Sequence, residues 1–372
     1  MRLTFKYRLK LTKPQQRQLE QALELCRWVY NETLATRKNA YQQHGETIGY
    51  FQTKRMLPDW KVRKPELKQV HSQNLQNVVM RVDLAFQAFF RRVKAGEEPG
   101  YPRFKGYGHY DSITFPQYGN SVMLNGRVLR LSKIGDVKVV LHRPIRGDIK
   151  TVTIQRSIGK WYACFSCEVG MKPLPVSSEM AGVDLGLKTF AALSSGETIK
   201  RQRWMKQDAR DIARLQRKKE NLPKGSVERR KVIYALQHAY QRSNNRRNDF
   251  AHQESRKLVN RFGLVVFEEL DIADMQGNGN KVVNRGIADV AWGRFVQYTL
   301  YKAENAGRAC VLVNPRGTTQ ECSDCGQVVP KGLRVRVHDC PHCGLRIDRD
   351  LNAALNILAR GMASIGAVRR DP

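Results

Sequence analysis

Four cysteines near the end of the chain have the spacing of a metal site. They form two CxxC pairs separated by fourteen residues, and they are Cys322, Cys325, Cys340 and Cys343. Zinc binds four thiolates in a tetrahedron at about 2.3 Å, and each CxxC turn supplies two of them without strain. The spacing predicts a structural Zn²⁺ site. His338 and His342 lie nearby, but with four thiolates present we expect neither to be a ligand.

The remaining four cysteines have no such spacing. Cys164 and Cys167 are three residues apart but lie in the alternating stretch WYACFSCEV. Residues three apart in a strand point to opposite faces, so one ion cannot reach both. Cys26 and Cys310 lie in apolar helix and strand patterns. We expect all four to be thiols of the core.

Acidic side chains interrupt apolar stretches at two places and precede an apolar helix at a third. Asp184 lies in GVDLG, Glu268 lies in VVFEEL, and Asp348 and Asp350 precede LNAALN. A buried carboxylate without a partner is costly, and several converging carboxylates bind the Mg²⁺ ions of two-metal nucleases. Each acid also has an ordinary explanation, because an Asp before LNAAL can be a helix N-cap and a Glu at a strand end can be solvated. Their joint occurrence favours a metal site.

The charge of the chain indicates a polyanionic partner. The 372 residues carry a formal net charge of +31, and residues 201–261 contain 18 Lys or Arg against 6 Asp or Glu. Nucleic acid relieves such a charge by releasing condensed counterions. An anionic membrane surface is the competing partner, but the sequence has no apolar run of spanning length and no apolar signal segment at its start. We expect a cytoplasmic protein with reduced thiols and no membrane partner.

The elements that must position these residues fall into two halves. A short alternating stretch opens the chain, and residues 11–95 then show helical periodicity, with a helix start at Thr12-Lys13-Pro14. Residues 111–169 alternate with period two, including a hairpin signal at Asn125-Gly126. This predicts a small barrel or sandwich completed by the N-terminal strand. From residue 180 onward strands and helices alternate, which predicts an α/β domain with a polar helical region at 203–262.

Several motifs together resemble one family. GVDLGLKTF, VVFEELDIADM, CSDCG with CPHCG, and DRDLNAALNIL are similar to the TnpB (OrfB) proteins of bacterial insertion sequences, relatives of the type V CRISPR effector nucleases. The opening residues and YPRFKG at 101–106 resemble the same family, so the resemblance covers nearly the whole chain. Thr319 stands where many relatives have Ser, which keeps the hydroxyl.

The resemblance implies a multi-domain α+β fold. It has a small β-barrel with a helical insertion, then an RNase H-like (RuvC) α/β domain into which a four-cysteine zinc ribbon is inserted. The implied domains are a wedge-like barrel at 1–10 and 107–175, a helical recognition domain at 11–106, the RuvC-like domain at 176–317 and 346–372 with a basic insert at about 203–262, and the ribbon at 318–345.

The resemblance also implies a transposon-encoded, RNA-guided DNA endonuclease. Asp184, Glu268 and Asp350 would be its Mg²⁺-binding catalytic acids, and only the family pattern selects them over Glu269 and Asp348. A guide RNA and a double-stranded DNA target are the implied partners, and a monomer with its RNA is expected. The chain would support maintenance of the transposon. The candidate nucleic-acid contacts are Arg103, Phe104, Lys105, Arg217, Lys218 and Lys219.

Two other functions stay open from the sequence. A non-cleaving, RNA-guided DNA-binding regulator would have lost one acid, whereas all three are present. A transposase that cuts and joins transposon ends on an RNase H core carries its acids in the order Asp, Asp, Glu. The order here is Asp, Glu, Asp, with the cysteines between the last two.

Overall fold

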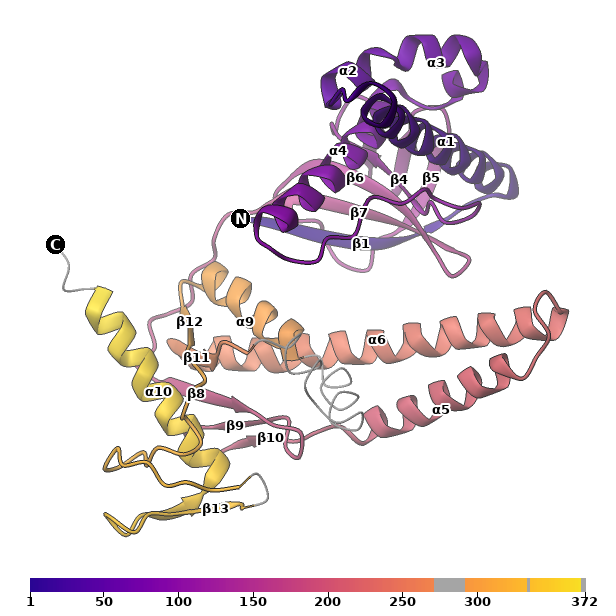
Figure 1. The fold of residues 1–372 in the computed structure, drawn as a ribbon. Coiled ribbons are helices and arrows are strands. Elements are labelled where there is room, and N and C mark those ends of the chain that lie inside the picture. Colours follow the sequence, from indigo (N-terminus) through magenta and orange to yellow (C-terminus); the bar gives the residue numbers. More distant parts are fainter. Residues whose placement is uncertain (271–291, 333–334, 369–372) are drawn as a thin grey trace. The chain divides into compact units, whose positions relative to one another are not determined.

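The computed structural model describes residues 1–270, 292–332 and 335–368 (Figure 1). The chain forms two compact units, here called unit 1 (Met1–Gly170) and unit 2 (Met171–Pro372). Each unit has its own hydrophobic core, and each is described by itself. No helix of the described residues is both long enough and apolar enough to cross a bilayer.

Unit 1 contains a seven-stranded antiparallel sheet in the order β2-β6-β7-β1-β5-β4-β3. The opening strand β1 pairs with both β5 and β7, so it completes the sheet as the sequence predicted. The hairpin predicted at Asn125-Gly126 joins β3 to β4, and Gly126 has a φ of +56°. The strand bounds are β1 Arg2–Lys10, β2 Ser112–Phe115, β3 Val122–Asn125, β4 Val128–Leu131, β5 Gly135–Val140, β6 Asp148–Ser157 and β7 Lys160–Glu168.

The hydrogen-bonded order of this sheet begins at β2 and ends at β3. What the structure shows is therefore an antiparallel sheet. Closure of these strands into a barrel stays a prediction from the sequence.

The helices of unit 1 lie between β1 and β2 in the chain. The long helix α1 begins at the predicted place, because the Thr12 hydroxyl accepts from the Gln15 amide and the Gln15 side chain accepts from the Thr12 amide. Apolar residues of α1 and α4 contribute to the same core as the sheet. The bounds are α1 Lys13–His44, α2 Tyr50–Arg55, α3 Leu57–Arg63, the 3₁₀ helix η1 Pro65–Gln69 and α4 Ser72–Lys94.

Unit 2 contains a five-stranded sheet in the order β10-β9-β8-β11-β12. The strands β8, β11 and β12 are parallel, whereas β9 and β10 continue the sheet antiparallel. The interior of β8 and almost all of β11 are buried, as continuous apolar runs predict for parallel strands covered on both faces. The bounds are β8 Met180–Leu185, β9 Ala191–Leu193, β10 Thr198–Ile199, β11 Leu264–Glu268 and β12 Ala309–Val313.

Four long helices of unit 2 are described. The polar region predicted at 203–262 forms two of them, α5 (Arg203–Glu220) and α6 (Val227–Arg261), which lie side by side as a long hairpin (Figure 1). The Arg229 side chain donates to the Lys219 and Leu222 carbonyls and so caps the end of α5. Helix α9 (Trp292–Ala306) packs on α6, and α10 (Arg349–Val368) packs on the sheet.

The four cysteines lie between β12 and α10 in the chain. This segment contains the two-stranded antiparallel sheet of β13 (Val337–Asp339) and β14 (Arg346–Asp348). The last residue of β14, Asp348, directly precedes the first residue of α10. The chain therefore enters its last helix immediately after the cysteine segment.

Candidate nuclease site and zinc site

Two of the predicted acids lie at the carboxyl ends of adjacent parallel strands. Asp184 lies near the end of β8, and Glu268 is the last residue of β11. The register of these strands pairs Phe267 with Val183, so Asp184 and Glu268 are the next residues on neighbouring strands. Carboxyl ends of parallel strands are a common place for sites in open α/β sheets.

Helix α10 approaches the same strands because two glycines leave room for it. A β-carbon on Gly182 would lie 2.1 Å from the Ala354 carbonyl oxygen, and one on Gly361 would lie 2.4 Å from a methyl group of Val266. Gly182 is in β8 and lies against the backbone of α10. Gly361 is in α10 and lies against the Val266 side chain of β11. The close packing brings the first turn of α10, which carries Asp350, toward Asp184.

The electrostatics of Asp184 reflect this convergence. Burial, followed by the negative charges of Glu268 and Asp350, raises the pKa of Asp184 to about 7, against a lowering by Arg349. The pKa of Glu268 is also raised by burial, although a hydrogen bond from Thr318 and the charge of Arg360 oppose the shift. Buried like charges that interact in this way are stabilised by a bound cation.

The structure assigns different contacts to the two aspartates of DRD. The exposed Asp348 accepts hydrogen bonds from the amides of Asp350 (2.8 Å) and Leu351 (3.2 Å), so it caps the helix. Asp350 is half-buried and pairs with Arg349 at 3.1 Å, and Arg336 lies 3.8 Å from the same oxygen. The helix-cap explanation that the sequence left open therefore describes Asp348. Asp350 is the less exposed of the two, and its charge raises the pKa of Asp184 more than the charge of Asp348 does.

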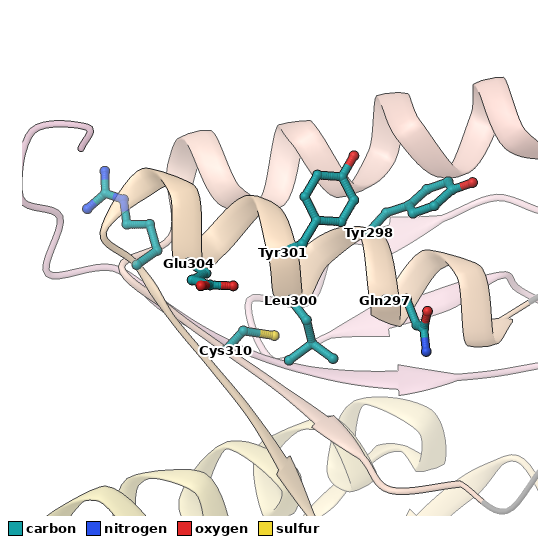
Figure 2. Close-up of a pocket in the computed structure, with 7 residues that line it drawn as sticks. Gln297, Tyr298, Leu300, Tyr301, Glu304 and Cys310 are labelled. Carbon is teal, nitrogen blue, oxygen red and sulfur yellow. The ribbon is translucent and has the colours of Figure 1, made fainter. Parts of the chain in front are cut away.

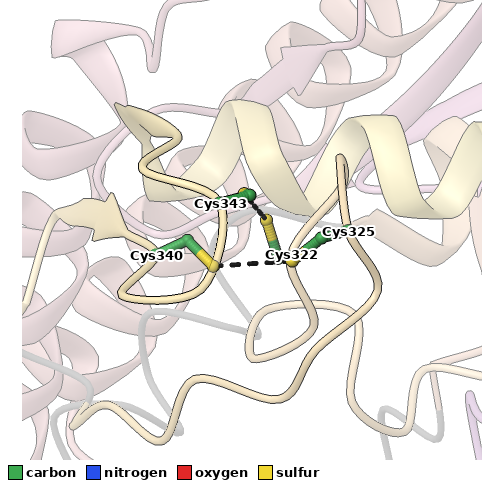
Figure 3. A group of neighbouring side chains, drawn as sticks. All are labelled: Cys322, Cys325, Cys340 and Cys343. Carbon is green, nitrogen blue, oxygen red and sulfur yellow. Dashed lines mark hydrogen bonds between the residues drawn. The ribbon is translucent and has the colours of Figure 1, made fainter.

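The four predicted zinc ligands lie together (Figure 3). Their sulfur atoms all lie within 4.8 Å of one another, with Cys322 and Cys343 3.6 Å apart and Cys325 and Cys340 also 3.6 Å apart. Among the described residues no other three ligating side chains lie this close together, the three acids included. Four thiolates are the donor set of a structural zinc site, so the residues fit Zn²⁺.

The two nearby histidines lie outside this group of sulfur atoms. His338 is fully buried, and its Nδ1 contacts the Lys331 ammonium. His342 is exposed. Of the other cysteines, Cys26 and Cys167 are buried in the core of unit 1 as expected, whereas Cys164 and Cys310 are half-buried. Burial raises the pKa of Cys26 to about 12, which leaves it a neutral thiol.

Three polar residues near Glu268 and the first cysteine pair were not singled out from the sequence. The Thr318 hydroxyl donates to the Glu268 carboxylate, and Asn352 and Asn356 of α10 are buried and bonded to the segment that leads into the first cysteine pair. The signal in the sequence was the pair of asparagines four residues apart in DLNAALN, which lie on one face of a helix whose neighbours are apolar. Thr318 had no comparable signal.

The candidate nucleic-acid contacts belong to two separate places. Arg217 and Lys218 are exposed and Lys219 is half-buried in the last turn of α5, in unit 2. Arg103, Phe104 and Lys105 are exposed on a loop of unit 1, and the Phe104 side chain is 52% exposed. This loop is held by Asn31, which accepts from the Lys105 amide at 2.8 Å and donates to its carbonyl at 3.0 Å. A fixed loop that presents cations and an aromatic ring suits contact with nucleic acid.

A pocket lies beside α9 in unit 2 (Figure 2). Its volume is about 580 Å³, and Tyr298, Leu300, Tyr301 and Cys310 are among the residues that line it. None of the predicted site residues lines this pocket. The acids and cysteines above therefore form the candidate site.

Comparison with known proteins agrees with this architecture. The family descriptions "Helix-turn-helix domain" (OrfB_IS605) at residues 1–46, "Probable transposase" (OrfB_IS605) at residues 164–279 and "Cas12f1-like, TNB domain" at residues 292–357 match this chain. At residues 1–46 the structure places strand β1 and helix α1. A solved Cas12f1 in complex with guide RNA and target DNA has the same mixed α/β fold, with a TM-score of 0.60 and 15% identity over 91% of this chain and 81% of that chain.

Two curated relatives align over almost their whole length. A protein of Streptomyces pristinaespiralis named "Putative RNA-guided DNA endonuclease" is 31% identical over 369 residues, covering 97% of this chain and 89% of the relative. "Putative RNA-guided DNA endonuclease InsQ" of Escherichia coli K12 is 28% identical, covering 96% and 92%. The chain thus has the mixed α/β fold of Cas12f1, and its residues 292–357 match the Cas12f1-like TNB domain. The chain belongs to the TnpB (OrfB, IS605) family of insertion-sequence proteins.

Proposed function

We propose that the chain is an RNA-guided DNA endonuclease whose acids Asp184, Glu268 and Asp350 carry out phosphodiester hydrolysis. The observation that carries the proposal is the convergence of these carboxylates. Two of them end neighbouring parallel strands, and both Glu268 and Asp350 raise the pKa of the buried Asp184. A bound cation would relieve this mutual repulsion, and clustered acids with shifted pKa values are typical of functional sites. Relatives named as RNA-guided DNA endonucleases support the reaction class.

The donor set of this site fits hard divalent cations such as Mg²⁺, which prefer carboxylate oxygens. Asp184, Glu268 and Asp350 would hold them. When bound in a two-metal site, such ions activate a water molecule and stabilise the leaving oxygen of the phosphodiester. The role of the protein would be to fix the three carboxylates on rigid elements. The close contacts at Gly182 and Gly361 hold α10 against β8 and β11 for this purpose.

Neighbouring cations would keep Asp350 in place. Arg349 pairs with Asp350, and Arg336 lies near the same oxygen. A charge-assisted pair fixes the orientation of the carboxylate group. The helix cap supplied by Asp348 fixes the turn that carries Asp350.

We assign unit 2 to an RNase H-like, RuvC-type nuclease domain at 176–317 and 346–372, with the α5–α6 hairpin as a basic insert and residues 318–345 as the zinc ribbon. The sheet, in which the neighbouring strands β8, β11 and β12 are parallel and β9 and β10 continue antiparallel, supports the assignment. We assign the sheet of unit 1, at 1–10 and 107–175, to a wedge-like barrel. Residues 11–106 form the helical recognition domain in this proposal.

The partners in this proposal are a transposon-derived guide RNA and a double-stranded DNA target. A net charge of +31 and the 18 cations at 201–261 supply attraction for a heteroduplex of RNA and DNA. Cas12f1, which shares the fold, was solved in complex with guide RNA and target DNA. We place the action of the protein in the bacterial cytoplasm as a monomer bound to its RNA, where it supports maintenance of the transposon.

Direct action on transposon ends is the second candidate, because one matching family description reads "Probable transposase". The order of the acids in the chain, Asp, Glu and then Asp, favours the nuclease over the strand-transfer enzymes that use Asp, Asp and Glu. A regulator without cleavage is disfavoured because all three acids are present.

Purification with the native flanking sequence of the gene tests the proposal. The protein is expected to retain a discrete RNA, and the complex is expected to cut DNA that carries a sequence complementary to that RNA. Bound RNA without a defined sequence, or joining of transposon ends by the purified protein, would contradict it.

A further inference from the structure

The segment between β12 and the first cysteine pair is attached to one of the acids. Thr318 is 2% exposed, and its hydroxyl donates to Oε1 of Glu268, fifty residues earlier in the chain. The Pro315 carbonyl, 3.1 Å away, is the second acceptor within reach of this hydroxyl. Because a hydroxyl has one proton to donate, and an ionised carboxylate is the stronger acceptor, the Glu268 bond fixes the orientation of Thr318 and of the carboxylate together.

The same segment is attached on its other side to helix α10. The Asn352 side chain is fully buried, accepts from the Ser323 amide at 2.9 Å and donates to the Glu321 carbonyl at 2.7 Å. The Asn356 amide group donates to the Thr318 carbonyl at 2.9 Å and to the Glu321 carbonyl at 2.8 Å. These contacts hold both ends of the turn from residue 318 to residue 323.

Ser323 connects these bonds to the zinc site. It lies between Cys322 and Cys325, so its amide belongs to the first CxxC turn. A continuous set of hydrogen bonds therefore leads from the CxxC turn through Asn352, Glu321 and Asn356 to Thr318, and from Thr318 to Glu268. The buried members of the set share several bonds, and loss of a bond to a buried polar group is costly, so the set resists movement of its members.

We propose, on the basis of the function proposed above, that Thr318, Asn352 and Asn356 are positioning residues through which the four-cysteine segment holds Glu268 in place for the divalent cations. The ribbon then serves the nuclease site directly as well as stabilising its own fold. Residues that orient the ligands of a metal typically change metal affinity or activity by about 10–100-fold when they are replaced. None of the three touches the DNA phosphodiester in this proposal.

Thr318→Val is the direct test, because it removes the hydroxyl and keeps the shape of the side chain. Binding of Mn²⁺ to the protein–RNA complex is measured by electron paramagnetic resonance, with the signal of Asp184→Ala subtracted as background. We expect Thr318→Val to weaken this binding by about tenfold and to raise the Mn²⁺ concentration needed for cleavage by a similar factor. Thr318→Ser keeps the donor and is expected to stay within about twofold of the natural protein.

Thr319→Val is the matched control, because it makes the same change one residue further along the chain. Within the described part of the chain, the Thr319 hydroxyl makes no hydrogen bond to another side chain or carbonyl. Equal Mn²⁺ binding by Thr318→Val and Thr319→Val would overturn the inference. If Thr318→Val weakens Mn²⁺ binding but no complex cuts DNA, the proposed function fails while the positioning role stands.

Asn352→Ala tests the connection to the cysteines. Hydrogen exchange of the Ser323 amide is expected to quicken by more than about tenfold, zinc content to stay at one ion per chain, and Mn²⁺ binding to weaken as for Thr318→Val. Met362→Ala, at an exposed position of the same helix, is the control for general loosening of α10. Faster exchange at Ser323 with unchanged Mn²⁺ binding would show that the cysteine segment does not act on Glu268.

Discussion

Gly182 of β8 and Ala354 of α10 lie so close that a β-carbon at residue 182 would be 2.1 Å from the Ala354 carbonyl oxygen. Such a distance is far inside van der Waals contact, and the atom in the way belongs to the backbone. Asp184 follows Gly182 by two residues, and Asp350 precedes Ala354 by four, or about one helical turn. The absence of a side chain at residue 182 is therefore a condition for bringing Asp184 and Asp350 together.

Gly182→Ala should separate α10 from the sheet. We expect the free energy of unfolding to fall by about 3 kcal/mol, at the upper end for overpacking, since a backbone group must move. Cleavage should fall more than binding of nucleic acid. Urea denaturation measures the stability, and Gly170→Ala, where an added β-carbon would meet nothing within 4 Å, is the matched control. Equal stability of the two variants would show that α10 does not require this close approach.

Zinc should bind at one ion per chain to the four cysteines. Cys322→Ser is expected to lose the ion, because an uncharged hydroxyl replaces one of four thiolates. Metal analysis after gel filtration measures the zinc content. The control is Cys164→Ser, which changes a cysteine outside the group and should leave the zinc content at one. Zinc retained by Cys322→Ser would contradict the four-thiolate site.

The stability of the metal-free protein should depend on the ionisation of Asp184. Burial, followed by the charges of Glu268 and Asp350, raises the pKa of this carboxyl to about 7 in the folded chain, from an ordinary value near 4. Between these values the folded chain holds a proton that the unfolded chain has released. The contribution of Asp184 to stability is thus fully present below pH 4 and is lost as the pH rises through 7.

Asp184→Asn should remove this part of the pH dependence, and Mg²⁺ should restore stability at neutral pH by binding the ionised acids. Melting temperatures between pH 4 and pH 8 measure both effects. Asp59→Asn, which changes an exposed acid of α3, should keep the pH dependence of the natural protein. A melting temperature that responds equally to pH in both variants would mean that Asp184 is not the titrating group.

The last turn of α5 should bind phosphate through charge. Replacing Arg217, Lys218 and Lys219 by Gln should weaken RNA binding and reduce the slope of log K against log salt by up to about 3, one unit for each lost phosphate contact. The matched variant Arg217→Lys, Lys218→Arg, Lys219→Arg keeps the charges and should keep the slope. Filter binding at several salt concentrations measures it. An unchanged slope after the Gln replacements would assign the contacts to other cations.

Local signals in the sequence predicted much of the fold. Thr12 with Pro14 marked the start of α1, Asn125-Gly126 marked the hairpin of β3 and β4, and the alternating opening residues were placed in the sheet. These features depend on residues close in the sequence. The break between α5 and α6 at residues 221–226 was not separated from the surrounding polar pattern, because charge and helical periodicity are similar on both sides of it.

The candidate site depended more on contacts between distant residues. Asp184 and Glu268 could be named because each interrupts an apolar run, Asp350 from its place before LNAALN and the family resemblance, and the cysteines because of their spacing. The distinction between Asp348 and Asp350 needed the hydrogen bonds that make Asp348 a helix cap. The Thr318–Glu268 bond joins residues fifty positions apart, and no periodicity or motif in the sequence predicts such a pairing.

DNA cleavage by the purified protein–RNA complex under single-turnover conditions is the most direct test of the central claim, that Asp184, Glu268 and Asp350 act together on a phosphodiester. Asp184→Asn removes one carboxylate and keeps its size. The account predicts a fall in the cleavage rate of more than about 100-fold, which exceeds the loss typical of residues that only orient metal ligands. DNA affinity should stay within about threefold of that of the natural protein. Cleavage by Asp184→Asn at the rate of the natural protein would contradict the account.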